Sequence, residues 1–328
     1  MARDQAGEVA ELPSVAAGLT LTTDKGAKMS QQQVEAGGGR RKVVLSCALT
    51  GVLTDPQQHR VPVTPAEMAD HAEQAWNAGA TIVHLHFRDQ TPGWGRMPSW
   101  EPEVAVAVAE AIRARCPKML LNFSTGVMGA DISGPLACLE AGRPELAALN
   151  AGTLNYLKLR SGGEWAWPPL VFENPVEKIE QFIATMDRLG IVPECECFDT
   201  GIVRSVAMFQ QRGMLKGPVH LSLVMGVASG MPADPRWLPL LVDEMPAGAL
   251  WQVIGIGRQE VWALHKAALP LGGHLRTGLE DTFYLPNGEK TDSNGRLVQA
   301  LAQLVREGGC EVATAEETRR ILGLDHQT

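Results

Sequence analysis

The chain has 328 residues, of which 45% are hydrophobic, and it carries a formal net charge of −8 at pH 7. This is enough apolar material for a large buried core, and single α/β barrels commonly reach this length. The negative charge argues against a nucleic-acid partner, because phosphate binding needs a basic field. The sequence has no apolar run of about 18 residues, so it predicts no membrane-spanning helix.

The first 41 residues differ from the rest of the chain. Residues 1–41 mix Gly, Ala, Gln and charged residues without sustained periodicity, and they end in the Gly- and Arg-rich run Gly37–Arg41. A mitochondrial presequence would be poor in acids, whereas this stretch contains Asp4 and Glu8 among others. We therefore predict a disordered extension over residues 1–41 and one catalytic barrel domain over residues 42–328.

From residue 42 onward, short apolar runs alternate with amphipathic segments. The predicted strands are Val43–Leu49, Thr81–Phe87, Lys118–Phe123, Leu146–Asn150, Val192–Phe198, Val219–Met225, Trp251–Gly255 and His274–Leu279. The predicted helices are Pro65–Ala78, Glu101–Arg115, Pro175–Leu189, Ile202–Gln211, Arg236–Glu244, Arg258–Leu269 and Asn294–Glu307, with a weaker helical pattern at Asp131–Ala141. Thr64 is the expected N-cap of the first helix, since Pro65 stands at its first position.

Strands that each precede a helix imply an all-parallel sheet covered by helices. Because the strands are uniformly short and number eight, we predict an α/β fold of the (β/α)8 TIM-barrel type. An open doubly wound sheet is the alternative, and the lack of a G-x-G-x-x-G after the first strand disfavours it. Thr153–Pro168 is the least regular stretch, and we expect a long loop there, at the face where such loops often carry function.

The cysteines indicate reduced thiols. Most lie in or beside predicted strands and helices, with no secretory signal ahead of them, so a cytoplasmic location is expected rather than disulfides. Cys195 and Cys197 alternate on one strand without a second pair at zinc-site spacing, and we expect them in the core. The cysteines are Cys47, Cys116, Cys138, Cys195, Cys197 and Cys310.

His84-Leu85-His86 is the most informative triplet in the sequence. Residues i and i+2 of a strand project to the same face, so both imidazoles point one way. At the carboxyl end of a barrel strand that direction can be the lumen, and two imidazoles in a polar cavity need a shared proton or a cation such as zinc. Two hydrogen-bonded core histidines are the alternative.

The end of the eighth strand favours the metal. It reads Arg276-Thr277-Gly278-Leu279-Glu280-Asp281, which places a cation and two carboxylates at the mouth of the barrel. Strands two and eight both flank strand one, so Glu280 is predicted to reach a cation held by the two histidines. Two histidines and one carboxylate leave a coordination position open, as catalytic zinc sites do. An exposed ion pair between Arg276 and Asp281 is the alternative.

Two further strand ends offer polar groups. Ser124, Thr125 and Gly126 follow the third strand and supply hydroxyls and backbone N–H groups suited to a carboxylate or a developing oxyanion. Asn150 occupies the equivalent position after the fourth strand. Simple turn chemistry would explain the same residues.

Glu194 and Glu196 share one face of the fifth strand. If that face is inward, they are buried acids suited to proton transfer or to support of a metal ligand. His220 on the sixth strand is a core histidine or a supporting group, and the sequence does not decide between these.

Taken together, these residues resemble the β-keto acid cleavage enzyme family, whose founding activity acts on 3-keto-5-aminohexanoate. The resemblance covers about Val43 to Leu324. The matching motifs are Ala48–Gly51, Pro62–Pro65, Ala80–Arg88, Ser124–Gly126, Leu149–Asn155, Gly255–Arg258, Gly272–Arg276, Gly278–Asp281 and Ser293-Asn294.

The resemblance implies a zinc-dependent acyltransferase that converts a β-keto acid and acetyl-CoA to acetoacetate and a new acyl-CoA. It implies that His84, His86 and Glu280 hold the zinc. It further implies that Asp281 is the general base, supported by Arg276, and that Ser124 contacts the keto acid. The small-molecule partners are then a β-keto acid and acetyl-CoA, and the expected assembly is a homo-oligomer, with a tetramer as the first choice.

The sequence departs from the founding activity in the loop after the first strand. Leu53 stands where aminohexanoate-cleaving members carry a glutamate that pairs with the substrate amino group. Ala148 replaces a threonine, and Val127 replaces a second glycine after Gly126. We expect the reaction to survive these changes and the substrate to differ, with Leu53 as a selector in the substrate pocket.

Two other readings remain open at this stage. A zinc hydrolase or a metal-dependent aldolase could use the same constellation, because the residues alone do not name the bond that is broken. Hydrolysis would proceed without acetyl-CoA. A non-enzymatic binding protein is the third reading, and it predicts ligand binding without turnover.

Overall fold

The structure is a computed structural model that describes residues 39–52, 54–227 and 229–324. Residues 1–38 of the extension predicted over residues 1–41, the predicted selector Leu53 and the last four residues therefore lie outside the described residues. Arg41, which the sequence assigned to the extension, donates from its guanidinium to the carbonyl oxygen of Leu269 at 2.8 Å.

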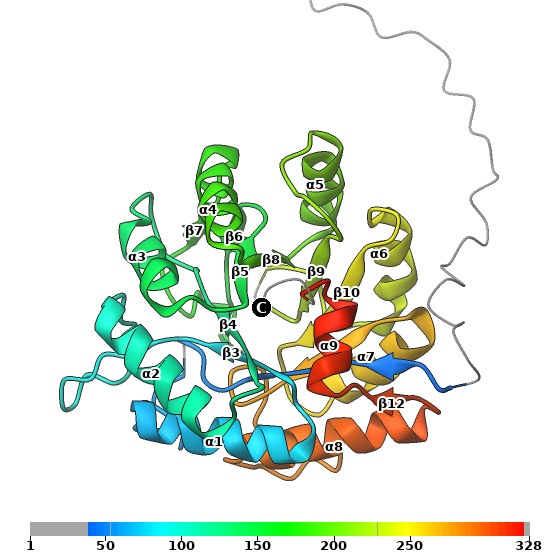
Figure 1. Cartoon of the computed structure of the whole chain (residues 1–328), viewed down its shortest axis with the longest axis horizontal. Coiled ribbons are helices and arrows are strands. Elements are labelled where there is room, and N and C mark those ends of the chain that lie inside the picture. The colour runs from blue at the N-terminus through cyan, green and yellow to red at the C-terminus, as the bar shows by residue number, and fades with distance from the viewer. Residues whose placement is uncertain (1–38, 53, 228, 325–328) are drawn as a thin grey trace, which may run out of the picture. The chain divides into compact units, whose positions relative to one another are not determined.

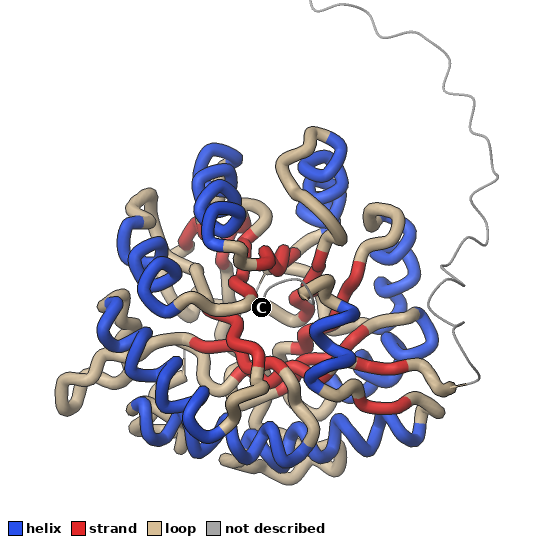
Figure 2. The backbone as a smooth tube through the Cα atoms, viewed as in Figure 1, coloured by secondary structure: helices blue, strands red, loops and turns tan. Residues whose placement is uncertain are grey.

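Eight parallel strands close into a barrel, which confirms the predicted (β/α)8 architecture and excludes the open sheet (Figures 1 and 2). The strands pair in the order β10-β11-β2-β3-β4-β5-β8-β9. Their bounds are β2 (Leu45–Ala48), β3 (Ile82–Leu85), β4 (Leu120–Phe123), β5 (Leu146–Asn150), β8 (Val192–Cys197), β9 (His220–Met225), β10 (Leu250–Gly255) and β11 (His274–Thr277).

Helices surround the barrel and lie close to their predicted positions. α1 begins with the expected cap, because the Thr64 hydroxyl accepts from the backbone N–H of Glu67, and the Glu67 carboxylate accepts from Thr64 in return. The segment with the weaker pattern is also helical. The bounds are α1 (Pro65–Ala78), α2 (Pro102–Arg115), α3 (Ser133–Gly142), α4 (Val176–Leu189), α5 (Thr200–Gln211), α6 (Leu238–Glu244), α7 (Val261–Ala268) and α8 (Asn294–Glu307), with short 3₁₀ turns at Pro235–Trp237 and Leu269–Leu271. None of the described helices is long and apolar enough to cross a membrane.

The segment after β5 contains the predicted long loop over residues 157–169, and two short strands at its ends, which the sequence did not predict, close it into a hairpin. β6 (Leu154–Tyr156) and β7 (Leu170–Phe172) pair antiparallel, and the rings of Tyr156 and Trp167 stack with their centroids 5.7 Å apart. The two strands are too short to show a period in sequence, and the pairing depends on residues some fifteen positions apart.

The two ends of the described chain add elements that the sequence did not reveal. β1 (Lys42–Val43) pairs in parallel with β12 (Glu311–Val312) outside the barrel. α9 (Ala315–Ile321) begins at a capping box formed by Thr314 and Glu317. These short elements bring the end of the described chain back against the first barrel strand.

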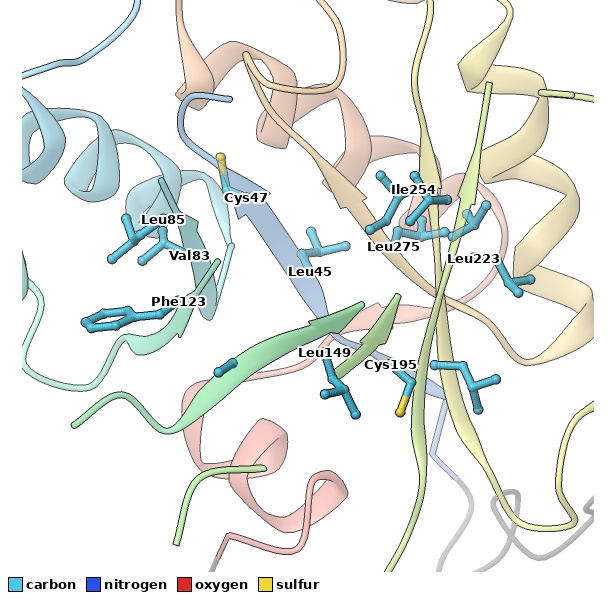
Figure 3. Close-up of a cluster of buried hydrophobic side chains, with 14 of the residues drawn as sticks. Leu45, Cys47, Val83, Leu85, Phe123, Leu149, Cys195, Leu223, Ile254 and Leu275 are labelled. Atoms are coloured by element: carbon cyan, nitrogen blue, oxygen red, sulfur yellow. The ribbon is translucent and has the colours of Figure 1, made fainter. Parts of the chain in front are cut away.

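Alternate side chains of each barrel strand divide the core into two layers. One set packs outward against the helices, and Figure 3 shows members of it such as Leu45, Val83, Leu85 and Leu149. The six cysteines are buried and free, as predicted, and Cys195 and Cys197 belong to this layer. The other set fills the lumen.

The amino-terminal end of the lumen is apolar and closed. Side chains from the first positions of several strands meet there, and Leu322 and Leu324, which follow α9, pack against them. The strand residues are Val44, Ile82, Leu120, Leu146 and Leu250. The carboxyl-terminal end of the lumen is therefore the end left for chemistry.

Candidate active site

Two imidazoles and one carboxylate converge at the carboxyl-terminal end of the lumen. His84 lies on β3 and His86 follows it, so both rings project from the same face of the strand. The Nε2 atoms of His84 and His86 are 3.3 Å apart. The Glu280 carboxylate lies 3.4 Å from Nε2 of His86 and 3.8 Å from Nε2 of His84.

These separations fit a tetrahedral metal. Zinc with bonds of about 2.0–2.1 Å places its ligand atoms roughly 3.3 Å apart. Within the described residues, His84, His86 and Glu280 form the one group of at least three such side chains whose ligand atoms all lie within 4.8 Å of one another. One carboxylate oxygen of Glu280 is also buried without a protein partner. The geometry is compatible with a metal site, and the nearby carboxylate is a feature that a simple pair of core histidines does not need.

Glu280 reaches this position because the chain after β11 passes very close to β2. Gly278 has a φ of +148°, and a Cβ at this residue would lie 2.1 Å from the carbonyl oxygen of Ala48. The backbone N–H of Glu280 then donates to the same carbonyl at 3.3 Å. A side chain at position 278 would push the Glu280 backbone away from the histidines.

The loop after β2 supports the other side of Glu280. A Cβ at Gly51 would lie 2.5 Å from the Cγ of Glu280, so the carboxylate arm lies directly against that glycine. The fully buried Arg88 holds the loop in place by donating to the carbonyl oxygen of Gly51 and, at 2.7 Å, to the hydroxyl of Thr50. Glu280 is therefore positioned by backbone contact from two loops.

Arg276 lies beside the cluster and is only 2% exposed. Its guanidinium donates to both oxygens of Asp281, at 2.9 and 3.2 Å, and to Glu280 at 2.8 Å. It also donates to Glu196 on β8 at 3.4 Å. The pair of Arg276 and Asp281 is thus deeply buried, and the alternative of an exposed ion pair is wrong.

Three carboxyl groups share this one guanidinium, and burial acts on the pKa of each. Burial would raise the pKa of Glu280, but the positive charge of Arg276 outweighs it and holds the value well below the usual range. Burial raises the pKa of Asp281, and the Glu280 carboxylate raises it further against the pull of Arg276. Burial also raises the pKa of Glu196 to about 8. A divalent cation would balance this cluster, because it would compensate the two carboxylates that Arg276 cannot neutralise alone.

His84 is held in the form that binds metals. Burial lowers its pKa well below the usual value for histidine, and the positive charge of Arg276 lowers it further. The neutral imidazole that results has a lone pair available for coordination.

The polar groups after β4 and β5 divide into two sets. The backbone N–H of Ser124 donates to the carbonyl of Leu85, which places Ser124 beside the histidine pair. A Cβ at Gly126 would lie 3.6 Å from the carboxamide nitrogen of Asn150 and 3.8 Å from the hydroxyl of Ser124, so these residues are neighbours. The Thr125 hydroxyl instead donates to the carbonyl of Ala148 at 2.6 Å, inside the barrel wall.

Glu194 and Glu196 both face the lumen. Glu196 joins the Arg276 cluster, whereas Glu194 lies one layer deeper and accepts a hydrogen bond from Asn122 at 2.9 Å. His220 faces the lumen at its closed end, where it lines a small cavity of about 20 Å³ together with His274 and Leu322. It is therefore a core histidine remote from the metal ligands.

The sequence placed Asn294 in a matching family motif but assigned it no role. Its carboxamide nitrogen donates to the carbonyl of Leu49 at 3.0 Å, and its oxygen accepts from the backbone N–H of Leu279 at 2.9 Å. Asn294 thus ties together the two loops that position Glu280. A polar residue at the start of an apolar helix face was the available signal, but a capping role explains the same pattern.

The closed barrel, the convergent side chains and the buried Arg–carboxylate cluster at the carboxyl ends of the strands together define a (β/α)8-barrel enzyme with a candidate site for a divalent metal. Residues 42–324 match the family of beta-keto acid cleavage enzymes, and the chain belongs to that family.

Characterised relatives cover most of the chain. It is 35% identical over 286 residues to the 3-keto-5-aminohexanoate cleavage enzyme of Fusobacterium nucleatum, covering 86% of this chain and 98% of that protein. It is 34% identical over 288 residues to the 3-oxoadipate:acetyl-CoA acetyltransferase of Cupriavidus necator, covering 86% of this chain and 94% of that protein. Among solved structures, ObcA in a ternary complex with a C4-CoA adduct and oxalate is similar with a TM-score of 0.64 and 21% identity, covering 80% of this chain and 67% of that chain, which supports the fold.

Proposed function

We propose that this protein is a zinc-dependent β-keto acid cleavage enzyme that condenses a β-keto acid with acetyl-CoA and releases acetoacetate and a new acyl-CoA. The carrying observation is the convergence of His84, His86 and Glu280 next to the buried pair of Arg276 and Asp281. The Cupriavidus relative is named as an acetyl-CoA acetyltransferase, which supports the choice of acetyl-CoA as co-substrate.

The metal ligands and the base have separate tasks in this proposal. Bound by His84, His86 and Glu280, zinc would supply a Lewis acid that polarises a carbonyl oxygen. Asp281 accepts the proton from the α-carbon of the keto acid, and its raised pKa makes it a stronger base than an ordinary aspartate. Arg276 fixes the direction of that carboxylate, since it binds both oxygens.

The polar groups after β4 and β5 suit the carboxylate of the keto acid. Ser124 and Asn150 are buried and offer a hydroxyl and a carboxamide near each other, and a Cβ at Gly126 would be in van der Waals contact with both side chains. Neutral donors of this kind bind an anion without adding a charge to the cluster. Thr125 contributes to the same pocket by anchoring the turn.

A panel of β-keto acids, assayed with and without acetyl-CoA and scored for acetoacetate, tests the reaction. We expect acetoacetate only when both substrates are present. Carboxylate release without acetyl-CoA would instead identify a hydrolase, and cleavage to an aldehyde or ketone would identify an aldolase. If a keto acid binds but is not turned over with any co-substrate, the protein is a non-enzymatic binding protein.

Metal analysis and sedimentation test the remaining parts of the proposal. We expect one zinc per chain by elemental analysis of protein purified without chelators. A homo-oligomer, with a tetramer as the first choice, and a cytoplasmic location stay predictions, and sedimentation and cell fractionation test them respectively.

The tail of the substrate is a separate prediction that depends on Leu53. The names of the two relatives give keto acids whose tails carry opposite charges. One tail has an amine and the other has a second carboxylate, so similarity alone does not identify the tail of the substrate of this chain. An ammonium buried without a partner loses several kcal/mol of hydration. We therefore propose a β-keto acid with a short, uncharged apolar tail.

Leu53→Glu tests this choice of tail. The substitution is expected to raise kcat/KM for 3-keto-5-aminohexanoate relative to the apolar keto acid, because it supplies the missing partner. Leu53→Gln serves as the matched control, since it adds polarity without charge. A wild-type enzyme that prefers the aminated acid would remove Leu53 as the selector.

A further inference from the structure

A chain of polar side chains leads from His84 away from the active site, into the middle of the lumen. His84 on β3 and Asn122 on β4 are paired in register, and both are 1% exposed. Glu194 on β8 lies on the same lumen-facing layer and is 4% exposed. None of these groups can exchange its hydrogen bonds with bulk water, so each must be satisfied inside the barrel.

His84 and Asn122 each hold one buried polar atom that needs a partner. Within the described residues, neither Nδ1 of His84 nor the carboxamide oxygen of Asn122 has a hydrogen-bond partner. The two residues are paired in register on neighbouring strands, and one atom can donate while the other accepts. The geometry therefore points to a contact between the Nδ1–H and this oxygen.

Glu194 decides which end of the Asn122 carboxamide faces His84. The carboxamide nitrogen donates to the Glu194 carboxyl at 2.9 Å, so the oxygen must point the other way, toward the imidazole. Ser222 and Gln252 line the lumen on the neighbouring strands β9 and β10, in register with each other. They are themselves linked, because the Gln252 carboxamide donates to the Ser222 hydroxyl at 2.9 Å.

This arrangement fixes the tautomer of His84. An imidazole with its proton on Nδ1 carries its lone pair on Nε2, and Nε2 is the atom that lies beside His86 and Glu280. If the acceptor were lost, the Nδ1–H would be buried without a partner, or the proton would move to Nε2 and remove the ligand. Groups that orient a metal-binding histidine in this way raise its basicity.

We propose that Asn122, held by Glu194, is a positioning residue that sets the metal affinity of the site through His84. The inference rests on the proposed function, because it assumes that His84 is a metal ligand. It gives the polar middle layer of the lumen a role that does not require contact with the substrate.

The test is the affinity for zinc, measured on the metal-free full-length chain by competition with a chromophoric chelator. Asn122→Leu keeps the volume and removes the acceptor, and we expect the affinity to fall about 10- to 100-fold. Asn122→Asp keeps an acceptor for Nδ1 and should stay within about threefold of the wild type. Ser46→Ala is the matched control, since this buried lumen hydroxyl lies on β2, and the affinity should not change.

Cobalt provides a second signature, because its visible absorption reports the geometry of the ligands. We expect Asn122→Leu to alter the cobalt spectrum and Ser46→Ala to leave it unchanged, while the metal-free variants unfold at similar temperatures. If Asn122→Leu does not fold, Glu194→Leu removes the support of Asn122 from a greater distance and should also weaken zinc binding. Wild-type affinity in the folded leucine variants would overturn the inference alone, whereas a wild-type chain that binds no zinc would overturn the proposed metal site with it.

Discussion

The two ends of the barrel lumen are built from opposite kinds of side chain on the same strands. At the amino-terminal end, Val44 and Ile82 meet Leu322 in an apolar cluster. At the carboxyl-terminal end, His84 lies two residues beyond Ile82 on β3, and the buried Arg276 of β11 pairs with Glu280. Buried ion pairs contribute little net stability, because desolvation offsets most of their attraction. The difference indicates that one end holds the barrel together so that the other can keep charges in place.

The strongest test of this division removes a metal ligand. His84→Ala or Glu280→Gln is expected to abolish turnover and zinc binding, while the free energy of unfolding of the metal-free protein changes little. Turnover, zinc content and urea unfolding are the measurements. His220→Asn is the matched control, because it changes a lumen histidine at the closed end and should retain zinc. Full activity with stoichiometric zinc in both ligand variants would remove the metal assignment.

The substitution Asp281→Asn distinguishes the role of the general base from that of the metal. This variant keeps the hydrogen bond to Arg276 but loses the proton acceptor, so we expect kcat to fall by about two to four orders of magnitude with zinc content unchanged. A loss of less than about tenfold would move the base to another group, with Glu194 or Glu196 next in line.

At the closed end, Leu322→Ala is expected to act on stability alone. Truncating this buried leucine removes contacts with the apolar cluster and leaves a cavity, which typically costs about 2–5 kcal/mol. Urea unfolding measures the loss, and kcat at a temperature where the variant is folded should match the wild type. A large loss of kcat in the folded variant would show that the two ends are coupled.

A smaller effect is expected from the pH dependence of stability. Burial lowers the pKa of His220 to about 4 from 6.5, so the folded state takes up this proton less readily than the unfolded state. The contribution of the neutral His220 side chain to the free energy of unfolding is therefore complete above pH 6.5 and is lost as the pH falls toward 4. The stability difference between the wild type and His220→Asn should change by about 1.4 kcal/mol per pH unit in that window. A difference that is constant between pH 7 and 5 would contradict the burial of a neutral imidazole.

The sequence predicted the barrel and the candidate metal ligands because both depend on short-range patterns. His84 and His86 are two residues apart on a strand, and Glu280 follows the last strand, so strand period and strand order are sufficient to bring them together. The roles of Asn122 and Asn294 were missed for the opposite reason. Asn122 is a single polar residue in an apolar strand, Asn294 lies in a polar segment that a helix cap explains, and each has a partner more than 30 positions away that only the closed barrel brings into contact. The hairpin of β6 and β7 was missed because its two short strands carry no period of their own.

The strand order also determines when the site can exist. β2 is the first barrel strand along the chain and β11 is the last, and they pair to close the ring. His84 lies on β3, on one side of this closure, and Glu280 follows β11 on the other, with Gly278 pressed against Ala48 between them. The ligand set is consequently incomplete on a ribosome until nearly the whole barrel has been synthesised. Any motion that parts β11 from β2 would separate the ligands, so the rate at which bound zinc escapes to a chelator would report how often the ring opens.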